Sequence, residues 1–421
     1  MAVGSKVYGD LELAFTDKFE WRYGNNGTKC HDWMSLWHPL PPEGFHALGT
    51  VLVPAKGAAN LKPERAGDPM SDEHVVALCV RDAGTAEDGK LPPLARPVDY
   101  EEVWNDKASA GIYNGSVWRP VAPEGYVALG CVAPVQSHDK PSLDAIMCVR
   151  EDLTHGSRPV KAFENHNSAG TDLGIWFNDV PQSSAPEDAA GTSQILIAPN
   201  TFAAHAKYAT PKFLAEMNVL RLTVDAGGSL PTEYPQLEGR EMPPERTMEA
   251  LANTLWLPFT AVRDEAKPVP WKLQKSPFYK VERRVSWLRL AFLNNDTGSD
   301  QKESIALTTG LEKEQTSNWN TSLGLSLSYT SGVSFGASAT VTVGFSMEYS
   351  FGGSVSTKSL ESKTITRELT VKPGTAAAAW TGSHTVQVKR ADNSRVGPAL
   401  ELKTASVHFD QYPDPEKNSD E

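Results

Sequence analysis

The most regular hydrophobic pattern in the chain lies between Leu323 and Phe351. Apolar residues occupy every odd position except Ser331, and Gly, Ser or Thr occupies every even position except Glu348. Because successive side chains of an extended chain point to opposite faces, this period of two predicts a β-ribbon with one apolar face. Ordinary strands have about 5–6 residues, so the ribbon must fold back on itself.

The position of the turn in this ribbon is open. The alternation is interrupted at Thr330-Ser331-Gly332, and Gly336-Ala337-Ser338 lies nearer the middle. Folded once, the segment gives two strands of about 14 residues, longer than the about 9–11 tilted residues that cross a bilayer. The sequence therefore predicts a hairpin that crosses a membrane and continues as a stem.

The polar face of the ribbon is nearly free of charge, because Thr316–Thr357 contains Glu348 as its one charged residue. A water-soluble sheet exposes Lys, Glu and Arg, whereas a transmembrane β-hairpin turns apolar residues to lipid and small polar residues to a water-filled lumen. One hairpin cannot close a barrel, and open strand edges are not tolerated in lipid. The pattern therefore predicts a homo-oligomer in which each copy donates one hairpin.

The two faces of this hairpin define the candidate site residues. We expect the lipid-facing residues to be the odd ones: Leu323, Leu325, Leu327, Tyr329, Val333, Phe335, Ala337, Ala339, Val341, Val343, Phe345, Met347, Tyr349 and Phe351. We expect the lumen-facing residues to be Ser326, Ser328, Ser334, Ser338, Thr340, Thr342, Ser346 and Glu348. Three other interpretations compete, namely the long strands of a soluble β-sandwich, a silk-like, aggregation-prone tract, and a low-complexity Ser/Gly linker. Linkers, however, lack strict apolar alternation.

The rest of the second half is also predominantly β in its pattern. Strands are predicted over Phe278–Leu293, Thr364–Val371, Thr385–Lys389 and Leu400–Phe409, and a single helix near Glu245–Leu255, after two prolines. No alternation of strands with helices is present, which argues against a parallel, doubly wound sheet.

The first half contains an internal repeat. Trp37–Gly49 matches Trp118–Gly130 at a constant offset of 81 residues, and each copy carries a Pro-Glu-Gly turn. A weaker third unit begins at Arg158 and includes Trp176. Short segments rich in Val, Tyr and Trp and separated by such turns are typical of antiparallel strands. We therefore expect an all-β chain whose first half is a pseudo-threefold β-prism.

The aromatic residues of the repeat have two interpretations. The equivalent Trp37 and Trp118 are expected to anchor the core of their units. An exposed aromatic ring can instead lie at a lipid or sugar surface, and Trp33 and Tyr113 are weaker candidates for receptor binding of this kind.

Two stretches resemble known families. "WRPVAPEGYVALGCV…KPSLDAIMCVRED" resembles the vacuolar protein sorting-associated protein 62 family over roughly residues 1–205, apart from an insertion at Pro54–Glu73. Related β-prisms bind membranes or carbohydrates, which is all that this resemblance implies about activity.

The second stretch, "ALTTGLEKEQTSNWNTSLGLSLSYTSG…FSMEYSFGGSVSTKSLESKTITRELTVKPGT", is similar to the pore-forming module of aerolysin-type toxins over roughly residues 276–410. It implies a water-soluble form that binds a membrane, oligomerises and refolds an amphipathic loop into a β-barrel. We expect a membrane- or receptor-binding domain over residues 1–208 and a pore-forming domain over 209–421, with the insertion loop at about 316–357. Proteolytic removal of a terminal segment is common in that family, and Tyr412–Glu421 is a candidate for it.

Composition and charge limit the partners. The 421 residues carry a formal charge of −12, which argues against nucleic acid because its binders present a basic face. No apolar run approaches the length of a transmembrane helix, and no secretory signal is visible. We therefore expect a soluble monomer or small oligomer, released or secreted by another route, that ends in the target-cell membrane.

Motifs of catalysis or metal binding are weak. Four cysteines form no Cys-x-x-Cys pair, and Cys79 and Cys148 occupy equivalent strand positions, which favours free thiols over a bridge without deciding the matter. Gly332–Gly336 formally matches a nucleophile elbow, but it lies inside the ribbon and not at a strand-to-helix turn. We expect no enzyme activity, no catalytic residue, no cofactor and no metal.

The function that these patterns favour is that of a pore-forming toxin, insecticidal or defensive, which causes cytolysis. Its partners would be a target-cell membrane or a receptor on it, whether glycan, lipid or protein. The alternative is a non-lytic lectin or membrane adaptor, which leaves the charge-free polar face of the ribbon unexplained.

Overall fold

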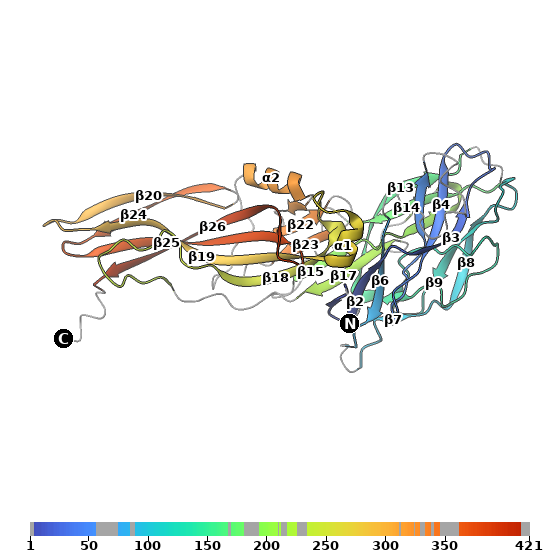
Figure 1. Ribbon diagram of the computed structural model, residues 1–421, viewed down its shortest axis with the longest axis horizontal. Helices are drawn as coiled ribbons and strands as arrows, with labels where there is room; N and C mark the ends of the chain where they lie inside the picture. The colour runs from blue at the N-terminus through green and yellow to red at the C-terminus, as the bar shows by residue number, and fades with distance from the viewer. Residues whose placement is uncertain are drawn as a thin grey trace.

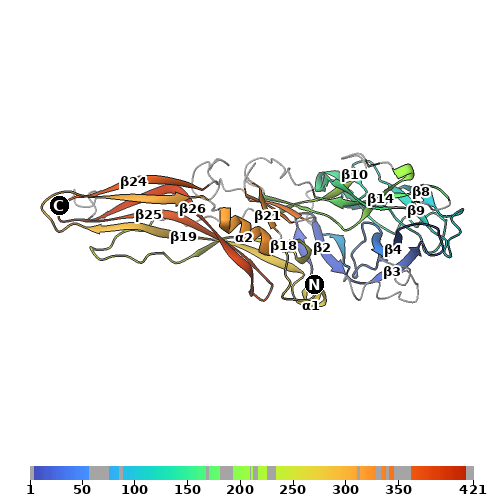
Figure 2. The same cartoon turned by 90° about the horizontal axis from the view of Figure 1, so that it is seen from above.

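The protein is described by a computed structural model at residues 4–55, 75–84, 89–166, 170–180, 193–208, 210–211, 217–224, 234–310, 313–323, 325–328, 333–337, 341–345 and 362–413. The molecule is elongated, with the strands of the amino-terminal half at one end and a shaft of long strands at the other (Figures 1 and 2). The described residues form antiparallel sheets and two α-helices, α1 (Val269–Lys275) and α2 (Lys313–Leu323). The expected all-β class is confirmed.

Three hairpin units make up the end of the amino-terminal half. They are β3 (Phe19–Gly24) with β4 (Trp33–Pro39) and β5 (Val51–Ala55); β8 (Asp99–Asn105) with β9 (Ser116–Val121); and β13 (Arg158–Glu164) with β14 (Gly174–Asp179) and β16 (Phe202–His205). Each unit has a β-bulge at the corresponding place, directly after the pairs Trp21↔Trp37, Glu102↔Trp118 and Lys161↔Trp176. The three units are therefore structural repeats.

The repeated tryptophans anchor the units, as expected. Trp37, Trp118 and Trp176 are all buried. The Nε1 groups of Trp37 and Trp118 each donate a 2.8 Å hydrogen bond to the hydroxyl oxygen of the serine two residues earlier. The three aromatic residues that follow the bulges, Tyr23, Trp104 and Phe163, share one hydrophobic cluster.

The repeated glycines explain why the second copy of the motif is so similar to the first. A Cβ atom at Gly49 would lie 3.0 Å from the Cα of Gly130 and 2.9 Å from Cγ2 of Thr201, and one at Gly130 would lie 2.5 Å from Thr201 Cβ. Backbone hydrogen bonds also connect the three units at this point. Thr50 N–H donates to Cys131 O, and Cys131 N–H donates to Phe202 O. The units meet here at a separation that leaves no room for side chains at Gly49 and Gly130.

Short strands connect this prism to the shaft. They are β1 (Lys6–Tyr8), β2 (Leu11–Thr16) and β6 (Ala77–Asp82) in one sheet, and β7 (Leu94–Ala95), β10 (Tyr126–Val127) and β11 (Cys148–Arg150) in another. A further sheet contains β12 (Thr154–Gly156), β17 (Asn218–Val224) and β15 (Ser193–Ile197). The four cysteines are all free and buried.

The shaft is a sheet in the order β18 (Ala250–Pro258), β19 (Phe278–Asn294), β25 (Ala376–Lys389) and β26 (Arg395–Tyr412), with the hairpin of β20 (Gln301–Thr309) and β24 (Lys363–Val371) beside it. The four predicted strands are confirmed, and each extends further than the pattern indicated. The predicted helix near Glu245–Leu255 is wrong. Residues 250–258 form β18, because its buried Leu255 and Leu257 follow the period of a strand packed on a core.

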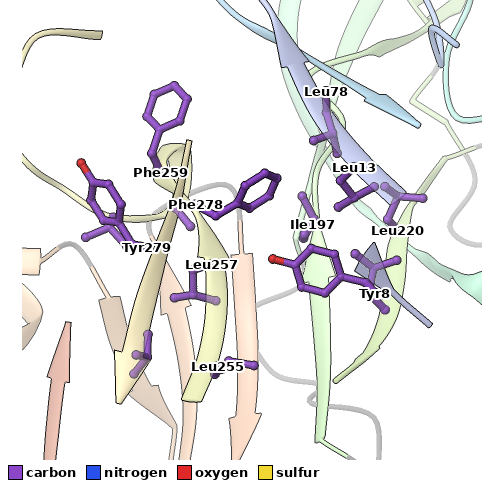
Figure 3. Packing of buried hydrophobic residues seen from close by; sticks show 14 of the residues in the cluster. Tyr8, Leu13, Leu78, Ile197, Leu220, Leu255, Leu257, Phe259, Phe278 and Tyr279 are labelled. Atoms are coloured by element: carbon purple, nitrogen blue, oxygen red, sulfur yellow. The ribbon is translucent and has the colours of Figure 1, made fainter. Parts of the chain in front are cut away.

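One hydrophobic core joins the two halves (Figure 3). Tyr8 donates a 2.9 Å hydrogen bond to the carbonyl of Trp256, and the ring of Phe15 lies 5.2 Å from Phe259 and 5.6 Å from Phe278. The predicted division after residue 208 remains a prediction, and β17, which follows it, pairs with β12 and β15 of the first half.

Candidate functional site: an amphipathic ribbon and its paired stem

The strands that enter and leave the ribbon are already paired with each other. β20 and β24 form nine consecutive antiparallel pairs from Gln301↔Val371 to Thr309↔Lys363, without a bulge, and the two residue numbers of every pair sum to 672. The ribbon is thus the closed end of a hairpin whose stem exists in this structure.

The two faces of the stem differ as the two faces of the ribbon do. Its odd-numbered residues Ile305, Leu369 and Val371 are buried and belong to a cluster with Ala377 and Ala379 of β25, and Leu307 is also buried. Its even-numbered face is exposed and carries an ion pair between Lys302 Nζ and Glu368 Oε1 at 2.7 Å. The buried apolar side chains of the stem therefore lie at odd positions, the parity of the apolar residues in the ribbon, although Glu303, Lys363 and Arg367 are odd-numbered as well.

The first part of the predicted insertion loop is helical, which corrects the expectation of an extended chain from Leu323 onward. Trp319 and Leu323 lie four residues apart in α2, on the same helix face, and both are fully buried. The carbonyl of Leu323 accepts a 2.7 Å hydrogen bond from Arg263 N–H. The Leu323 side chain fills the space above Gly397, where a Cβ atom would be 2.6 Å from Leu323 Cδ2. In this form Leu323 faces the protein core.

The ribbon that follows has three described strands, β21 (Leu325–Ser328), β22 (Val333–Ala337) and β23 (Val341–Phe345). They pair in the order β23-β22-β21. In this structure the ribbon therefore has three short strands, and the two strands of about 14 residues expected for the membrane-crossing hairpin stay a prediction. The chain reverses after β21 and again after β22. The candidate turn Thr330-Ser331-Gly332 falls between β21 and β22, whereas Gly336 and Ala337 of the other candidate lie within β22. Residues 329–332 and 338–340 lie outside the described residues.

The ribbon is held as an extension of a sheet in the first half. β23 pairs with β15 through Ile195↔Val343, Leu196↔Thr342 and Ile197↔Val341, giving the sheet order β12-β17-β15-β23-β22-β21. β22 and β21 contact the first half only through β23 in this sheet.

The structure brings the candidate site residues together only in part. Among the expected lipid-facing residues, those within described strands are Leu325, Leu327, Val333, Phe335, Ala337, Val341, Val343 and Phe345; among the lumen-facing residues they are Ser326, Ser328, Ser334 and Thr342. Outside the described residues lie Tyr329, Ala339, Met347, Tyr349, Phe351, Ser338, Thr340, Ser346 and Glu348. Their assignment to lipid or lumen stays a prediction. Ser334 lies within β22, not at a strand-to-helix turn.

The receptor-binding candidates occupy different settings. Trp33 is half-buried and pairs with Ala55 on the adjacent strand, and Tyr113 packs edge-on against Trp21, with ring centroids 4.9 Å apart. Tyr113 therefore contributes to the core around Trp21 as well as to the surface. Ile112 beside it is 71% exposed, although no pattern in the sequence singles it out.

The loops that close the three units meet at the tip of the prism. Asn25, Asp106 and Asn165 occupy the same place in each loop, and each accepts a hydrogen bond through Oδ1 from a backbone N–H eight or nine residues later. Ile112 N–H donates to Asn26 O, and His31 N–H donates to His166 O. The recurrence of Asn or Asp after each first strand is a signal that sequence alone could have provided.

The shaft contains a buried histidine beside a buried arginine. His384 of β25 and Arg283 of β19 are almost fully buried, and burial, followed by the charge of Arg283, lowers the pKa of His384 to about 3. In the first half, His38 is buried against Thr50 Oγ1 and the Ala145 carbonyl, and burial lowers its pKa to about 4. Both histidines are therefore neutral in the folded protein at neutral pH.

We expect the protein to lose stability as the pH falls below the ordinary histidine pKa of about 6.5. The unfolded chain binds protons there and the folded chain does not, so each such histidine costs about 2 kcal/mol at pH 5. In urea unfolding, His384→Gln should show a smaller fall in unfolding free energy between pH 7 and pH 5 than the parent chain. His31→Gln, at an exposed site, should leave the fall unchanged; an equal fall in all three proteins would contradict this account.

Comparison with known proteins supports part of the resemblance read from the sequence. A profile of the family described as vacuolar protein sorting-associated protein 62 matches residues 70–222, a stretch that begins and ends later than the predicted 1–205. No curated protein matches the chain.

Two solved structures are distantly similar. GNIP1Aa from Chromobacterium piscinae matches with a TM-score of 0.36 and 19% identity over 50% of this chain and 37% of that one. Cry35Ab1 matches with a TM-score of 0.32 and 10% identity over 77% of this chain and 90% of that one. The chain thus spans little more than a third of GNIP1Aa, and both likenesses concern the β-rich fold alone. Within the described part of the chain, no helix is long and apolar enough to cross a membrane.

Proposed function

We propose that the protein is a pore-forming toxin of the aerolysin type. Its amino-terminal half binds a target membrane or a receptor on it, and copies of the chain then assemble. The hairpin between β20 and β24 extends through the bilayer, and the hairpins of all copies close one β-barrel. The chain is released as a soluble protein and ends in the target-cell membrane, where leakage kills the cell.

The observation that carries the proposal is the register of the stem. If the β20–β24 pairing continues, every residue pairs with the one whose number completes 672. Because 672 is even, odd residues pair with odd ones, and both strands of the extended hairpin place their apolar residues on one face. An odd sum would have placed apolar residues opposite Ser and Thr. The same register puts the apex at Gly336, which selects the second of the two candidate turns.

The way in which α2 and β23 are held in this structure supports the proposal as well. Extension requires α2 to unfold and β23 to leave β15. The sequence of α2, Lys-Glu-Gln-Thr-Ser-Asn-Trp-Asn-Thr-Ser-Leu, is rich in residues of low helix propensity, so its helix depends on the buried Trp319 and Leu323. A helix held by so few anchors can convert to strand when they are released.

Dye release tests this function. Liposomes made from target-cell lipids and loaded with a self-quenching dye should leak on addition of the protein, and a detergent-resistant oligomer should appear in the same samples. The protein is assayed at neutral and acidic pH and after limited proteolysis, because the activating condition is unknown. Saturable membrane binding without leakage or oligomers under all these conditions would refute pore formation and leave a non-lytic lectin or adaptor.

A further inference from the structure

We propose that a cavity among the strands that connect the prism to the shaft binds one acidic sugar residue of a glycan, a uronic acid or a sialic acid. This inference rests on the proposed function for its role, because it gives a chemical class to the receptor that the amino-terminal half binds. Binding in the cavity is itself measured without a membrane.

The cavity has a volume of about 310 Å³, at the lower end of the about 300–1,000 Å³ that is usual for small-molecule sites. Its described lining comes from β1, the turn into β2, β11, the 3₁₀ helix at Glu151–Leu153, β17 and Lys90. Tyr8, whose hydroxyl group is already bonded, adds an apolar ring to the wall, against which the C–H groups of a sugar can pack. A space of this size and composition suits a single sugar ring.

A fixed network of charges around Arg150 forms one part of the wall. The Arg150 side chain is only 7% exposed, and its guanidinium donates to both carboxylate oxygens of Asp152, at 2.6 and 3.1 Å. It also donates to Asp10 Oδ2 at 2.5 Å and to the Leu91 carbonyl at 2.6 Å. The two carboxylates are therefore held in place. Each can accept further hydrogen bonds, because a carboxylate has about four lone-pair sites.

Two more cationic side chains, Lys90 and Arg221, line the same cavity. With Arg150 they give the described lining three positive charges against the two negative charges of Asp10 and Asp152, so one positive charge is in excess. A ligand with a single negative charge balances this lining. Arginine is well suited to a carboxylate, because its planar guanidinium can donate two parallel hydrogen bonds to it.

The mixture of charges distinguishes between classes of ligand. A phosphate dianion would meet the carboxylates of Asp10 and Asp152, and a simple cation would meet Lys90 and Arg221, with repulsion at short range in both cases. A sugar hydroxyl group donates to a carboxylate and accepts from an N–H group, and the carboxylate of an acidic sugar supplies the one negative charge. An acidic sugar is therefore the class of ligand that uses the donors and the acceptors of the cavity together.

Calorimetric titration of the full-length chain with matched sugars tests the inference. Methyl glucuronide and methyl glucoside share one ring and differ only in a carboxylate in place of a hydroxymethyl group, and a methyl sialoside tests the other source of an acidic sugar. We expect one of the two acidic sugars to bind about tenfold more tightly than methyl glucoside, because charge-assisted hydrogen bonds are the stronger ones. Inorganic phosphate and acetate test whether negative charge alone is sufficient.

Two variants connect the binding to the cavity. Arg221→Gln should weaken binding of the acidic sugar about tenfold. Lys90→Gln should weaken it about threefold, because Lys90 is exposed to water, and at this exposed site the variant tests the cavity even if Arg221→Gln fails to fold. Lys140→Gln is the matched control. Its side chain is 48% exposed and pairs with Asp99, outside the described lining of the cavity, so its loss should leave the affinity unchanged.

The outcomes separate this inference from the proposed function. If neither acidic sugar binds, the inference is overturned, whereas dye release and pore formation stand or fall on their own assay. Methyl glucoside, phosphate or acetate binding as tightly as the acidic sugar would overturn it too, as would an unchanged affinity in the folded Arg221→Gln and Lys90→Gln variants. Acidic-sugar binding by a chain that never releases dye would support the inference and refute pore formation.

Discussion

A disulfide between β15 and β23 should abolish membrane leakage, and reduction should restore it. Ile195 and Val343 lie directly opposite each other in these antiparallel strands. Directly opposed Cβ atoms are about 4.5–5.5 Å apart, close to the separation that a disulfide bridges after a small adjustment. The variant carries Ile195→Cys and Val343→Cys. Oxidation ties the ribbon to the first half, so the hairpin cannot extend and dye release should fall to the rate of liposomes without protein.

The native cysteines do not interfere with this experiment. All four are buried, and burial raises the pKa of Cys79 and of Cys148 to about 12 and that of Cys131 to about 11. The thiolate is the form that exchanges with disulfides, so mild oxidation acts on the engineered pair.

The stem provides the matched control. Thr308 and Thr364 are paired, exposed, and have their hydroxyl oxygens 3.4 Å apart. A disulfide between Thr308→Cys and Thr364→Cys joins strands that stay paired during extension, so its oxidation should leave leakage intact. Leakage by the oxidised β15–β23 variant at the rate of its reduced form would show that β23 does not leave β15.

The sequence predicts what depends on local pattern and misses what depends on long-range contacts. The alternation of apolar and small polar residues from Leu325 onward predicted strands. The repeat of tryptophans and glycines predicted the prism. The third copy is weaker because it has Thr201 in the place of Gly130 and lacks the Pro-Glu-Gly turn. Each of these signals lies within a single element or its repeat.

The helix α2 shows where such reasoning stops. The alternation of the ribbon extends through Leu323, yet in this form Leu323 is the last residue of a helix whose two buried residues contact a core made mostly of other strands. The same residues can therefore form a helix in this structure and a strand in the extended hairpin that we propose. Their local sequence is compatible with both. The three-stranded form of the ribbon depends on the pairing of β23 with β15. Because β15 is far from the ribbon along the chain, no local sequence pattern predicts this pairing. The stem register was likewise invisible in the sequence, although the candidate site depends on it.

An arginine at Val341 should eliminate leakage, whereas an arginine at the next residue, Thr342, should not. If the stem register continues through the hairpin as we propose, its apex is Gly336 and both residues stand about halfway through the about 9–11 residues that cross the bilayer. Arg on the lipid face of a β-barrel costs about 2–4 kcal/mol near the midplane, and every copy in the oligomer bears this cost. Arg on the lumen face remains in water.

In this structure the two residues are on opposite faces of β23, but both lie opposite buried partners. Val341 and Thr342 are adjacent in β23, opposite the buried Ile197 and Leu196. Circular dichroism and thermal unfolding identify any variant that fails to fold. Val341→Arg should still bind membranes but release no dye, and Thr342→Arg should release dye. Because the two arginines differ only in the face that the register assigns them, equal leakage from both would mean that the hairpin does not extend in that register.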